Sequence, residues 1–428
     1  MDSEILAFDP MTADTENPAP LSTEQALALL LSRAEPIAGI ETVAVADALG
    51  RVLAAPVISP IDQPGWDHSA MDGYALRAAD LAAHLATSAP LPISQRIPAG
   101  SVGEPLAPGT AARIFTGAPI PDGADTVVIQ EDCEADGERV SLIESALGRI
   151  RAGANIRRRG EDIAAGQTVL DPGVLLGPQH LGLAASVGAA ELQIRRRLRV
   201  AVFASGDELV MPGSPLGPGQ IYNSNRFMLI ALLRQLGCEL IDLGTVADER
   251  RATIDALARG AEQADIVLAS GGVSVGEEDH VRPAVEQLGR LDLWRVAMRP
   301  GKPLAFGHIG DTPFIGSPGN PVSLFVTFCL FARPFIRRMQ GVAGDLAPRG
   351  RSLPAGFSLE HPVKRRDYRR AKIAPGPDGR PCLHVFPSTS SAAITSLTWA
   401  EGLVDLPAGQ PVSQGQLLTF LPFSELLA

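Results

Sequence analysis

The chain has few cysteines, no regular histidine spacing and no long apolar run. Its four cysteines lie far apart with no CxxC pair, which excludes a disulfide framework and a thiolate metal site. The seven histidines show neither H-E-x-x-H nor another ligand spacing. No apolar run approaches 18 residues, and the N-terminus lacks an apolar signal core. These absences predict a cytoplasmic protein that does not span a membrane.

Positive charge and aromatic residues are also scarce. The net charge of −11 argues against nucleic acid as a general partner, because such binding needs a basic face. Basic residues concentrate in "NIRRRGED" (155–162) and "KRRDYRR" (364–370), which leaves a local basic pocket or a solvated charge run as alternatives. Aromatics make up only 5% of the chain, so the cores must be built from Ala, Leu, Val and Ile.

The pattern of apolar residues, glycines and prolines changes along the chain and predicts a multi-domain α/β plus β protein. Residues 197–340 alternate apolar strands with amphipathic helices, which predicts a central, doubly wound parallel sheet buried on both faces. Short strands separated by Pro-Gly turns predict flanking β-rich domains, the C-terminal one a small β-barrel with a sandwich as the alternative. The expected parts are a disordered N-terminus (1–20), an elongated linker domain (21–74 and 159–196), an inserted β domain (75–158), the α/β domain (197–345) and the C-terminal domain (346–428).

Acidic residues follow three predicted strands of the α/β domain. "SGDEL" (205–209), "TVADE" (245–249) and "SGGVSVGEED" (270–279) supply Glu208, Asp248 and Asp279. Ligands of such sheets bind beyond the carboxyl ends of the strands, so these acids should converge there. Converging carboxylates suit a hard cation such as Mg²⁺. The alternative for each acid is that it caps the following helix.

A second candidate site is suited to anions. In "GSPGNPVS" (316–323), Asn320 can cap a helix and Pro321 fits its first position, so the helix should begin with free N–H groups. Arg295, Arg299 and Lys302 lie shortly before it. Together these features predict binding of a phosphate or a tetrahedral oxyanion, with an ordinary capped core helix as the alternative.

Asp67, Ser69 and Asp72 in "GWDHSAMDGYAL" (65–76) lie among apolar neighbours at a predicted domain junction. Such a junction is a usual place for a functional cleft, and a structural hinge is the alternative. No GxxxxGK[ST] is present, and no GxGxxG opens a helix after a strand, so a P-loop or nicotinamide site is not indicated.

Eight motifs in order carry a resemblance to a known family: "DHSAMDGYA", "RIFTGAPIPDGADTVV", "NIRRRGED", "GDEL", "QIYNSN", "SGGVSVGEEDH", "PGKPLAFG" and "GSPGNPVS". They resemble the MoeA-type molybdopterin molybdenumtransferases of molybdenum cofactor biosynthesis, from about Leu21 to the C-terminus. The resemblance implies a transferase that inserts molybdate into adenylylated molybdopterin with Mg²⁺-dependent release of AMP. It also implies an elongated protomer in a homodimer, and a molybdopterin adenylyltransferase as a partner.

The resemblance also implies roles for individual residues. The acidic cluster would consist of Asp72, Asp162, Glu208, Asp248 and Asp279, with Asp72 and Asp162 supplied by the neighbouring protomer. Mg²⁺ would be held by Asp248, Asp279 or both. Substrate binding would fall to Ser270, Gly271, Gly272, Ser274, Arg295, Arg299, Pro300, Lys302, Pro318, Gly319, Asn320, Pro321, Ser323, Arg370 and Ser391.

Arg370 and Ser391 match positions associated with molybdate. Arg295 and Arg299 stand where the family often has Lys, and Ser317 stands where an apolar residue is usual. Two other functions remain open. The same α/β domain could adenylylate the pterin or hydrolyse a nucleotide pyrophosphate, or the chain could be a non-enzymatic scaffold.

Overall fold

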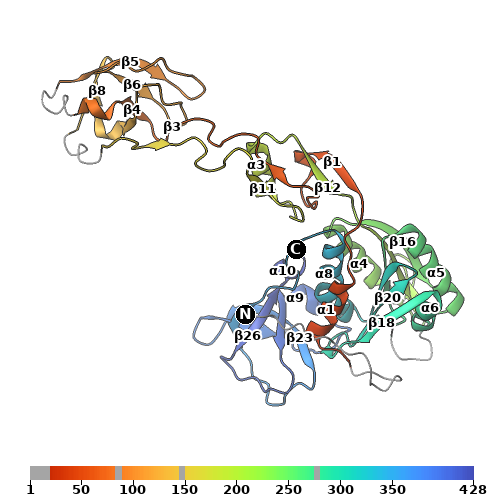
Figure 1. The fold of residues 1–428 in the computed structure, drawn as a ribbon. Coiled ribbons are helices and arrows are strands. Elements are labelled where there is room, and N and C mark those ends of the chain that lie inside the picture. Colours follow the sequence, from red (N-terminus) through yellow and green to blue (C-terminus); the bar gives the residue numbers. More distant parts are fainter. Residues whose placement is uncertain (1–19, 82–88, 144–149, 274–279) are drawn as a thin grey trace, which may run out of the picture.

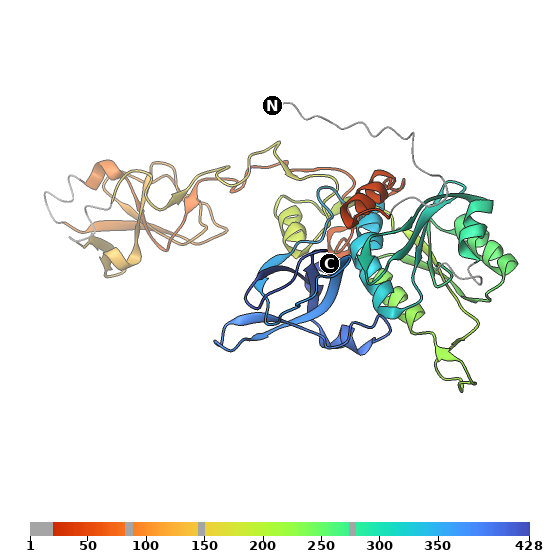
Figure 2. The ribbon, with the colours of Figure 1, turned by 90° about the horizontal axis from the view of Figure 1, so that it is seen from below.

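The computed structural model describes residues 20–81, 89–143, 150–273 and 280–428. The chain forms a body of two adjoining domains and a long arm, residues 40–195, that leaves the body and returns to it (Figures 1 and 2). Nearly all of the predicted N-terminal disordered segment, together with Ser274 and Asp279, lies outside the described residues. No helix of the described chain is both long and apolar enough to cross a membrane.

The α/β domain is built on a sheet with the strand order β16-β13-β17-β21-β20-β18. Four neighbouring strands of this sheet, β16, β13, β17 and β21, run parallel, as the sequence predicts. The prediction of a wholly parallel sheet is wrong for β20, which runs antiparallel to β21 and β18. Only Gly310 and Asp311 connect β20 to β21, a link that suits a hairpin and is too short for a parallel crossover. The strands are β13 (Arg199–Ser205), β16 (Glu239–Val246), β17 (Ile266–Ser270), β18 (Gly289–Arg295), β20 (Pro303–Ile309) and β21 (Thr312–Ser317).

Helices cover both faces of this sheet, which confirms the doubly wound arrangement. Val200 and Val202 of β13 belong to a core shared with α4 (Ser224–Gln235) and α7 (Pro321–Thr327). Ala201 and Phe203 belong to the core on the other face, under α5 (Arg250–Gln263) and α6 (Val281–Leu288). Alternate side chains of one strand therefore enter two different cores, as expected when a sheet is buried on both faces.

Local sequence signals mark the ends of several helices. Ser22 caps α1 (Thr23–Ser32): its Oγ accepts from the Gln25 amide, and the Gln25 side chain accepts from the Ser22 amide. Gly237, with φ of +75°, follows the end of α4. The helix that begins at α7 continues through a π-helical turn (Phe328–Ala332) into α8 (Arg333–Met339), which packs against α1.

The C-terminal domain pairs directly with the α/β domain. Its sheet has the order β19-β23-β25-β26-β22, and β24 pairs with β23 on the edge that faces away from β25. Strand β19 (Met298–Arg299) comes from the α/β domain and pairs with the start of β23, Met298 opposite Arg366. This pairing brings the segment after residue 297 beside the basic run 364–370. The other elements are β22 (Arg351–Pro354), β23 (Arg366–Pro375), β24 (Pro381–Val385), α9 (Thr395–Trp399), β25 (Gly402–Leu406), β26 (Leu417–Pro422) and α10 (Phe423–Leu426).

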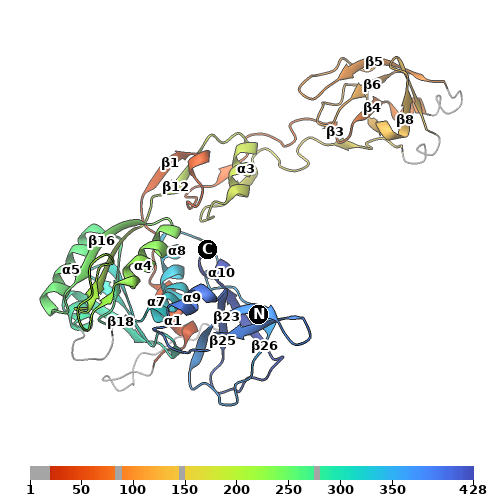
Figure 3. The same ribbon diagram turned by 180° about the vertical axis from the view of Figure 1, so that it is seen from behind.

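The arm consists of a linker near the body and a separate β sheet at its far end (Figure 3). The linker pairs β1 (Ile40–Ala44) with β12 (Glu191–Arg195) and β2 (Val57–Ile58) with β11 (Thr168–Leu170), and α3 (Pro178–Ser186) packs beside them. Towards the far end, β3 (His68–Ser69) pairs with β10 (Ile156–Arg157). The far sheet has the order β7-β4-β6-β5-β9-β8. Its strands are β4 (Gly73–Leu76), β5 (Leu91–Ile97), β6 (Ala111–Ile114), β7 (Thr126–Ile129), β8 (Cys133–Ala135) and β9 (Arg139–Leu142).

Candidate functional site

A cavity of about 790 Å³ lies beyond the carboxyl ends of β13, β16, β17 and β21 and reaches the C-terminal domain. Its place agrees with the general position of ligand sites in open α/β sheets. It brings together residues from eight separate chain segments, most of the predicted set among them. The predicted residues that line it are Glu208, Asp248, Ser270, Gly271, Gly272, Arg299, Pro300, Lys302, Pro318, Gly319, Asn320, Ser323 and Ser391.

Other predicted site residues do not line this cavity. Arg295 is the last residue of β18, Pro321 is the first residue of α7, and Arg370 lies in β23. Asp72 and Asp162 lie on the arm, between β3 and β4 and between β10 and β11, so a single chain does not bring them to the cavity (Figure 1). Ser274 and Asp279 lie outside the described residues.

Asp248 forms the acidic side of the cavity together with Glu208. It lies two residues after the end of β16, and the Ser205 hydroxyl at the end of β13 donates to its Oδ1 at 2.5 Å. Its amide donates to Asp207 Oδ1 at 3.1 Å, which ties the two strand ends together. The alternative of helix capping does not hold for Asp248, because the N-cap position of α5 is Glu249.

The acidic side fits a metal held by few protein ligands. Asp248 lines the cavity, and the described residues give its Oδ2 no hydrogen-bond donor, so this oxygen is not committed to another group of the described chain. No three His, Cys, Asp or Glu side chains of the described chain lie together as a complete metal cage. Mg²⁺ commonly binds through one or two carboxylates with substrate phosphates and water, and this arrangement is compatible with that mode.

Gly271 and Gly272 shape the wall beneath the acids. Gly271 has φ of +90°, and a Cβ atom there would lie 2.4 Å from the carbonyl oxygen of Ser205. Gly272 has φ of +64°, and its Cβ would lie 2.7 Å from Val281 Cγ2. Both positions need glycine because the end of β17 packs tightly against β13 and α6. The requirement for glycine therefore comes from the protein's own packing.

Three cations also line the cavity: Arg299, Lys302 and Arg365. Arg299 donates from NH2 to Thr389 Oγ1 at 2.9 Å, which joins β19 to the loop before α9. Within the described chain, no ion pair links these cations to Glu208 or Asp248. Arg365 is absent from the predicted set, although the basic run 364–370 contains it. The cavity thus presents separated charges of both signs.

The start of α7 meets a serine-rich loop of the C-terminal domain. Pro321 opens the helix as expected, and Asn320 occupies the N-cap position without a side-chain hydrogen bond. The amide of Val322 donates to the carbonyl of Ser391 at 3.0 Å. The expectation of free N–H groups is therefore wrong for Val322, because the loop that carries Ser391 satisfies it.

Asn225 was also missed by the sequence-based reasoning. Its Nδ2 donates to the Gly319 carbonyl at 2.6 Å and to Ser270 Oγ at 3.0 Å, so it joins the glycine turn to the end of β17. It is only 9% exposed, and its Oδ1 is buried without a hydrogen-bond partner. A second asparagine in the first turn of α4, two positions after the N-cap Asn223, is the signal that could have revealed it.

Arg370 lies behind the cavity wall. It is 2% exposed, and its guanidinium donates to Ser396 Oγ at 2.9 Å and to the carbonyls of Ser388 and Ser390 at 2.8 and 3.0 Å. Burial lowers the pKa of this guanidinium; Asp367 opposes that effect, while the charges of Arg369 and Arg299 add to it. These contacts hold the loop that brings residues 389–391 to the cavity.

The acids and arginines of the arm have local partners. Asp72 Oδ1 accepts from the amide and the hydroxyl of Thr116, both at 2.8 Å, and these bonds hold the pKa of Asp72 below its usual value. The basic run 155–162 is largely neutralised, since Arg158 pairs with Asp67 and Arg159 pairs with Asp62. In this part of the arm, most of the basic run serves as paired structural charges.

Comparison with known proteins matches three consecutive family models. Residues 21–188 match the MoeA N-terminal region (domain I and II), residues 201–338 a probable molybdopterin binding domain, and residues 352–423 the MoeA C-terminal region (domain IV). The chain is 37% identical over 409 residues to a molybdopterin molybdenumtransferase of Haemophilus influenzae, covering 95% of this chain and 100% of the relative. It is 40% identical over 374 residues to molybdopterin molybdenumtransferase 2 of Mycobacterium tuberculosis, covering 86% of this chain and 90% of the relative.

A solved structure shares the architecture. The crystal structure of the molybdopterin biosynthesis moea protein from Pyrococcus horikosii superposes with a TM-score of 0.74 at 29% identity, covering 95% of this chain and 99% of that chain. The chain therefore belongs to the MoeA family, the molybdopterin molybdenumtransferases of molybdenum cofactor biosynthesis, which are transferase enzymes.

Proposed function

We propose that this protein inserts molybdate into adenylylated molybdopterin, with Mg²⁺-dependent release of AMP. The observation that carries the proposal is the set of charges that lines the cavity: Asp248, whose Oδ2 has no hydrogen-bond donor among the described residues, lies in one cavity with Arg299, Lys302 and Arg365. A pyrophosphate with its bound cation and a tetrahedral oxyanion would need both kinds of charge in one site.

Asp248 would hold Mg²⁺ through Oδ2, and Asp279 would join it. The metal would supply Lewis-acid polarisation of a phosphoryl oxygen when bound. Arg299, Lys302 and Arg365 would bind the phosphate and oxyanion groups, and the hydroxyl of Ser205 would keep the Asp248 carboxylate oriented. The remaining expected acids are Asp72, Asp162 and Glu208, and the remaining expected substrate contacts are Ser270, Gly271, Gly272, Ser274, Arg295, Pro300, Pro318, Gly319, Asn320, Pro321, Ser323, Arg370 and Ser391.

Asp72 and Asp162 would complete the cavity of a second copy in a homodimer. The arm carries them away from the cavity of their own chain, which is what a shared site would require (Figure 1). Apolar side chains near Asp72 are exposed: Trp66 by 55% and Met71 by 47%. A second copy would cover such a surface, since contiguous exposed apolar patches usually mark interaction sites.

The finer domain description is part of this proposal. Ala355, directly after β22, forms a parallel bridge with Leu383 of β24, so the two edges of the C-terminal sheet meet. This contact supports a small closed β-barrel over residues 346–428. We also propose the domain boundaries 21–74 with 159–196, 75–158 and 197–345, with α1 of the first segment packed on the body. A cytoplasmic location, and a molybdopterin adenylyltransferase as the partner that supplies the substrate, belong to the same proposal.

The test is AMP release from adenylylated molybdopterin, measured with and without molybdate and Mg²⁺. Asp248→Ala should slow release about 100-fold, because several kcal/mol of transition-state stabilisation would be lost. Asp255→Ala is the matched control, since Asp255 lies on α5 outside the cavity and pairs with Arg251 on the surface. Full AMP release by the Asp248 variant would contradict the proposal. AMP release that does not need molybdate would indicate a pyrophosphatase. Adenylylation of the pterin from ATP would indicate an adenylyltransferase, and the absence of any turnover would indicate a scaffold.

A further inference from the structure

The junction between the arm and the body is polar. The apolar core of the linker, which includes Leu53, Leu192 and Ile194, shares no residue with the apolar cores of the body in the described chain. The arm leaves the body after Ile37 and returns before Leu198, so two neighbouring segments cross the junction. Because no continuous apolar core spans this point, specific hydrogen bonds must set the direction of the arm.

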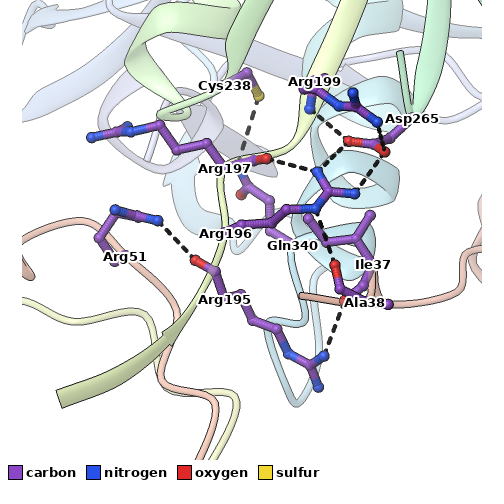
Figure 4. A network of polar contacts seen from close by, with 10 residues as sticks. All are labelled: Ile37, Ala38, Arg51, Arg195, Arg196, Arg197, Arg199, Cys238, Asp265 and Gln340. Atoms are coloured by element: carbon purple, nitrogen blue, oxygen red, sulfur yellow. Dashed lines mark hydrogen bonds and ion pairs between the residues drawn. The ribbon is translucent and has the colours of Figure 1, made fainter. Parts of the chain in front are cut away.

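Arg196 joins both crossing segments to the body (Figure 4). Its NH1 and NH2 donate to the two carboxylate oxygens of Asp265 at 2.7 and 2.8 Å, a bidentate fork. Its Nε donates to the carbonyl of Ala38 on the outgoing segment at 3.1 Å. One planar guanidinium is thereby held from two sides, which fixes its orientation as well as its position.

The Asp265 carboxylate accepts hydrogen bonds from Arg199 as well as from Arg196. Asp265 directly precedes β17, and the backbone amide and the guanidinium of Arg199 donate to its carboxylate at 2.8 and 3.3 Å. Its side chain is 11% exposed and that of Arg196 is 29% exposed, so water screens this pair less than it screens a surface pair. Burial acts to raise the pKa of Asp265, but the hydrogen bonds from Arg196 and Arg199 outweigh it and hold the pKa below its usual value.

A second contact steadies the base of the arm from the linker side. Arg51 donates to the carbonyl of Arg195 at 2.9 Å, and Arg195 donates to the carbonyl of Ile37 at 3.0 Å (Figure 4). Arg51 also donates to Glu41 at 2.7 Å. These bonds join β1 and β12 to each other at their base. Among the contacts drawn, the fork of Arg196 is the one that reaches from the returning segment to the carboxylate at the start of β17.

We infer that Arg196 and Asp265 are positioning residues that set the direction of the arm and thereby align the residues that the arm contributes to the active site of a second copy. We call the ion pair of Arg196 with Asp265, together with the hydrogen bond from Arg196 to Ala38, the clamp. The clamp itself rests on these contacts, and its consequence in catalysis rests on the proposed function. The far sheet lies a long way from the junction, so a small rotation at Arg196 becomes a large displacement near Asp72 (Figure 1). Misplacement of a reacting group by about 1 Å can cost about 100-fold in rate.

The clamp itself is tested without catalysis, by pulsed electron resonance distances between spin labels. The labels would be placed at Val102, 86% exposed in the loop between β5 and β6 of the far sheet, and at the exposed Glu262 on α5. The background would be Cys133→Ser, in which the other cysteines are buried. Labelled chains would be diluted with unlabelled ones so that distances within one chain dominate. Arg196→Ala should broaden the distance distribution. Asp265→Asn, which preserves shape but not charge, should broaden it as well.

Arg197→Ala is the matched control for this measurement. Arg197 is the exposed neighbour and donates to the carbonyl of Gly237, so it does not reach Asp265. Its variant should leave the distribution unchanged. Arg196→Lys should give an intermediate width, because an ammonium group cannot form the fork. A distribution that stays narrow in both Arg196→Ala and Asp265→Asn would overturn the clamp.

The catalytic consequence is tested in mixed dimers of an Asp248→Ala chain with an Asp72→Ala chain. Only one complete site remains, formed by the cavity of the Asp72 variant and the arm of the Asp248 variant. Adding Arg196→Ala to the Asp248 variant, whose arm is in use, should lower kcat about 10- to 100-fold with KM changed less than about twofold. The same change in the Asp72 variant, whose arm is idle, should leave the rate unchanged.

Equal losses from both placements would overturn the positioning role, because Arg196 would then act on its own chain's cavity through β17. If the mixed dimer without any Arg196 change recovers no activity, the shared site of the proposed function is wrong. The spin-label distances would still support or overturn the clamp in that case, so the two failures are distinguishable.

Discussion

Replacing Arg370 by Met would remove the guanidinium that holds the loop before α9. The loop carries Thr389 and Ser391 to the cavity, and its shape depends on donors from Arg370 to the carbonyls of Ser388 and Ser390. Met has nearly the same length and is apolar, so it fills the buried space without supplying a donor. The variant therefore isolates the hydrogen bonds from the packing.

The expected loss follows from three hydrogen bonds. Each bond from a charged donor contributes about 1.5–3 kcal/mol, and the buried acceptors left without a donor carry a desolvation cost. Part of this loss of stability is offset, because a buried Met carries no charge that must be desolvated. The desolvation cost of the Arg370 guanidinium is reflected in its pKa, which burial lowers. We expect the C-terminal domain to lose about 3–5 kcal/mol of its free energy of unfolding.

The assay is urea unfolding followed by the fluorescence of Trp399. This residue ends α9, directly after the loop, and its ring packs edge-to-face on Phe386 with centroids 5.3 Å apart. Trp66→Phe and Trp294→Phe would make it the only indole. Arg380→Met is the control, because the Arg380 side chain is 86% exposed and its ion pair with Asp378 is long, at 3.8 Å. The control should change stability by less than about 0.5 kcal/mol.

An unchanged unfolding midpoint for Arg370→Met would refute this reasoning. Unchanged stability combined with lost molybdate binding would show that the guanidinium leaves the loop to bind the anion. Lower stability together with a lower rate of AMP release would support a role behind the cavity wall.

Two further predictions concern charges outside the expected set. Arg365→Ala should raise KM for adenylylated molybdopterin about two- to fivefold with little change in kcat, since an exposed cation contributes up to about 1 kcal/mol. Lys364 lies outside the cavity lining, so Lys364→Ala should leave KM unchanged. Equal effects of the two substitutions on KM would contradict this prediction. Because the pKa of Asp265 is lowered in the folded protein, its carboxylate stabilises the fold above the pKa of an unfolded Asp, about 3.9, and this stabilisation is lost as the pH falls through the folded-state pKa. The urea midpoints of the unmodified protein and of Asp265→Asn should therefore converge on acidification below about pH 4. A difference between the midpoints that stays constant with pH would contradict this prediction.

Short-range signals in the sequence predicted the helices of the body well. Pro321 begins α7 where the sequence analysis placed it, and Ser22 and Asn223 cap α1 and α4 through contacts with residues three positions away. These features act within one helical turn, so nearby residues decide them whatever the rest of the chain does. The same holds for the apolar run of β17, which is buried over its whole length.

Contacts between distant segments were not predictable in this way. The antiparallel course of β20 depends on a two-residue turn, and the entry of Arg365 into the cavity depends on the pairing of β19 with β23. The resemblance associates Arg370 with molybdate, and the sequence did not reveal that its guanidinium also donates to the carbonyls of Ser388 and Ser390 in the loop before α9.

The sequence by itself determined the family, the strand ends that carry acids, and the concentration of basic residues near the C-terminal domain. Those properties follow from motifs and from periodicity along the chain. Only the tertiary structure decided that Ser205 orients Asp248, that the Ser391 carbonyl takes the amide of Val322, and that Arg196 reaches Asp265. The physical reason is that a hydrogen bond depends on the separation and angle of two groups in space, and chain folding sets both for residues that lie tens of positions apart.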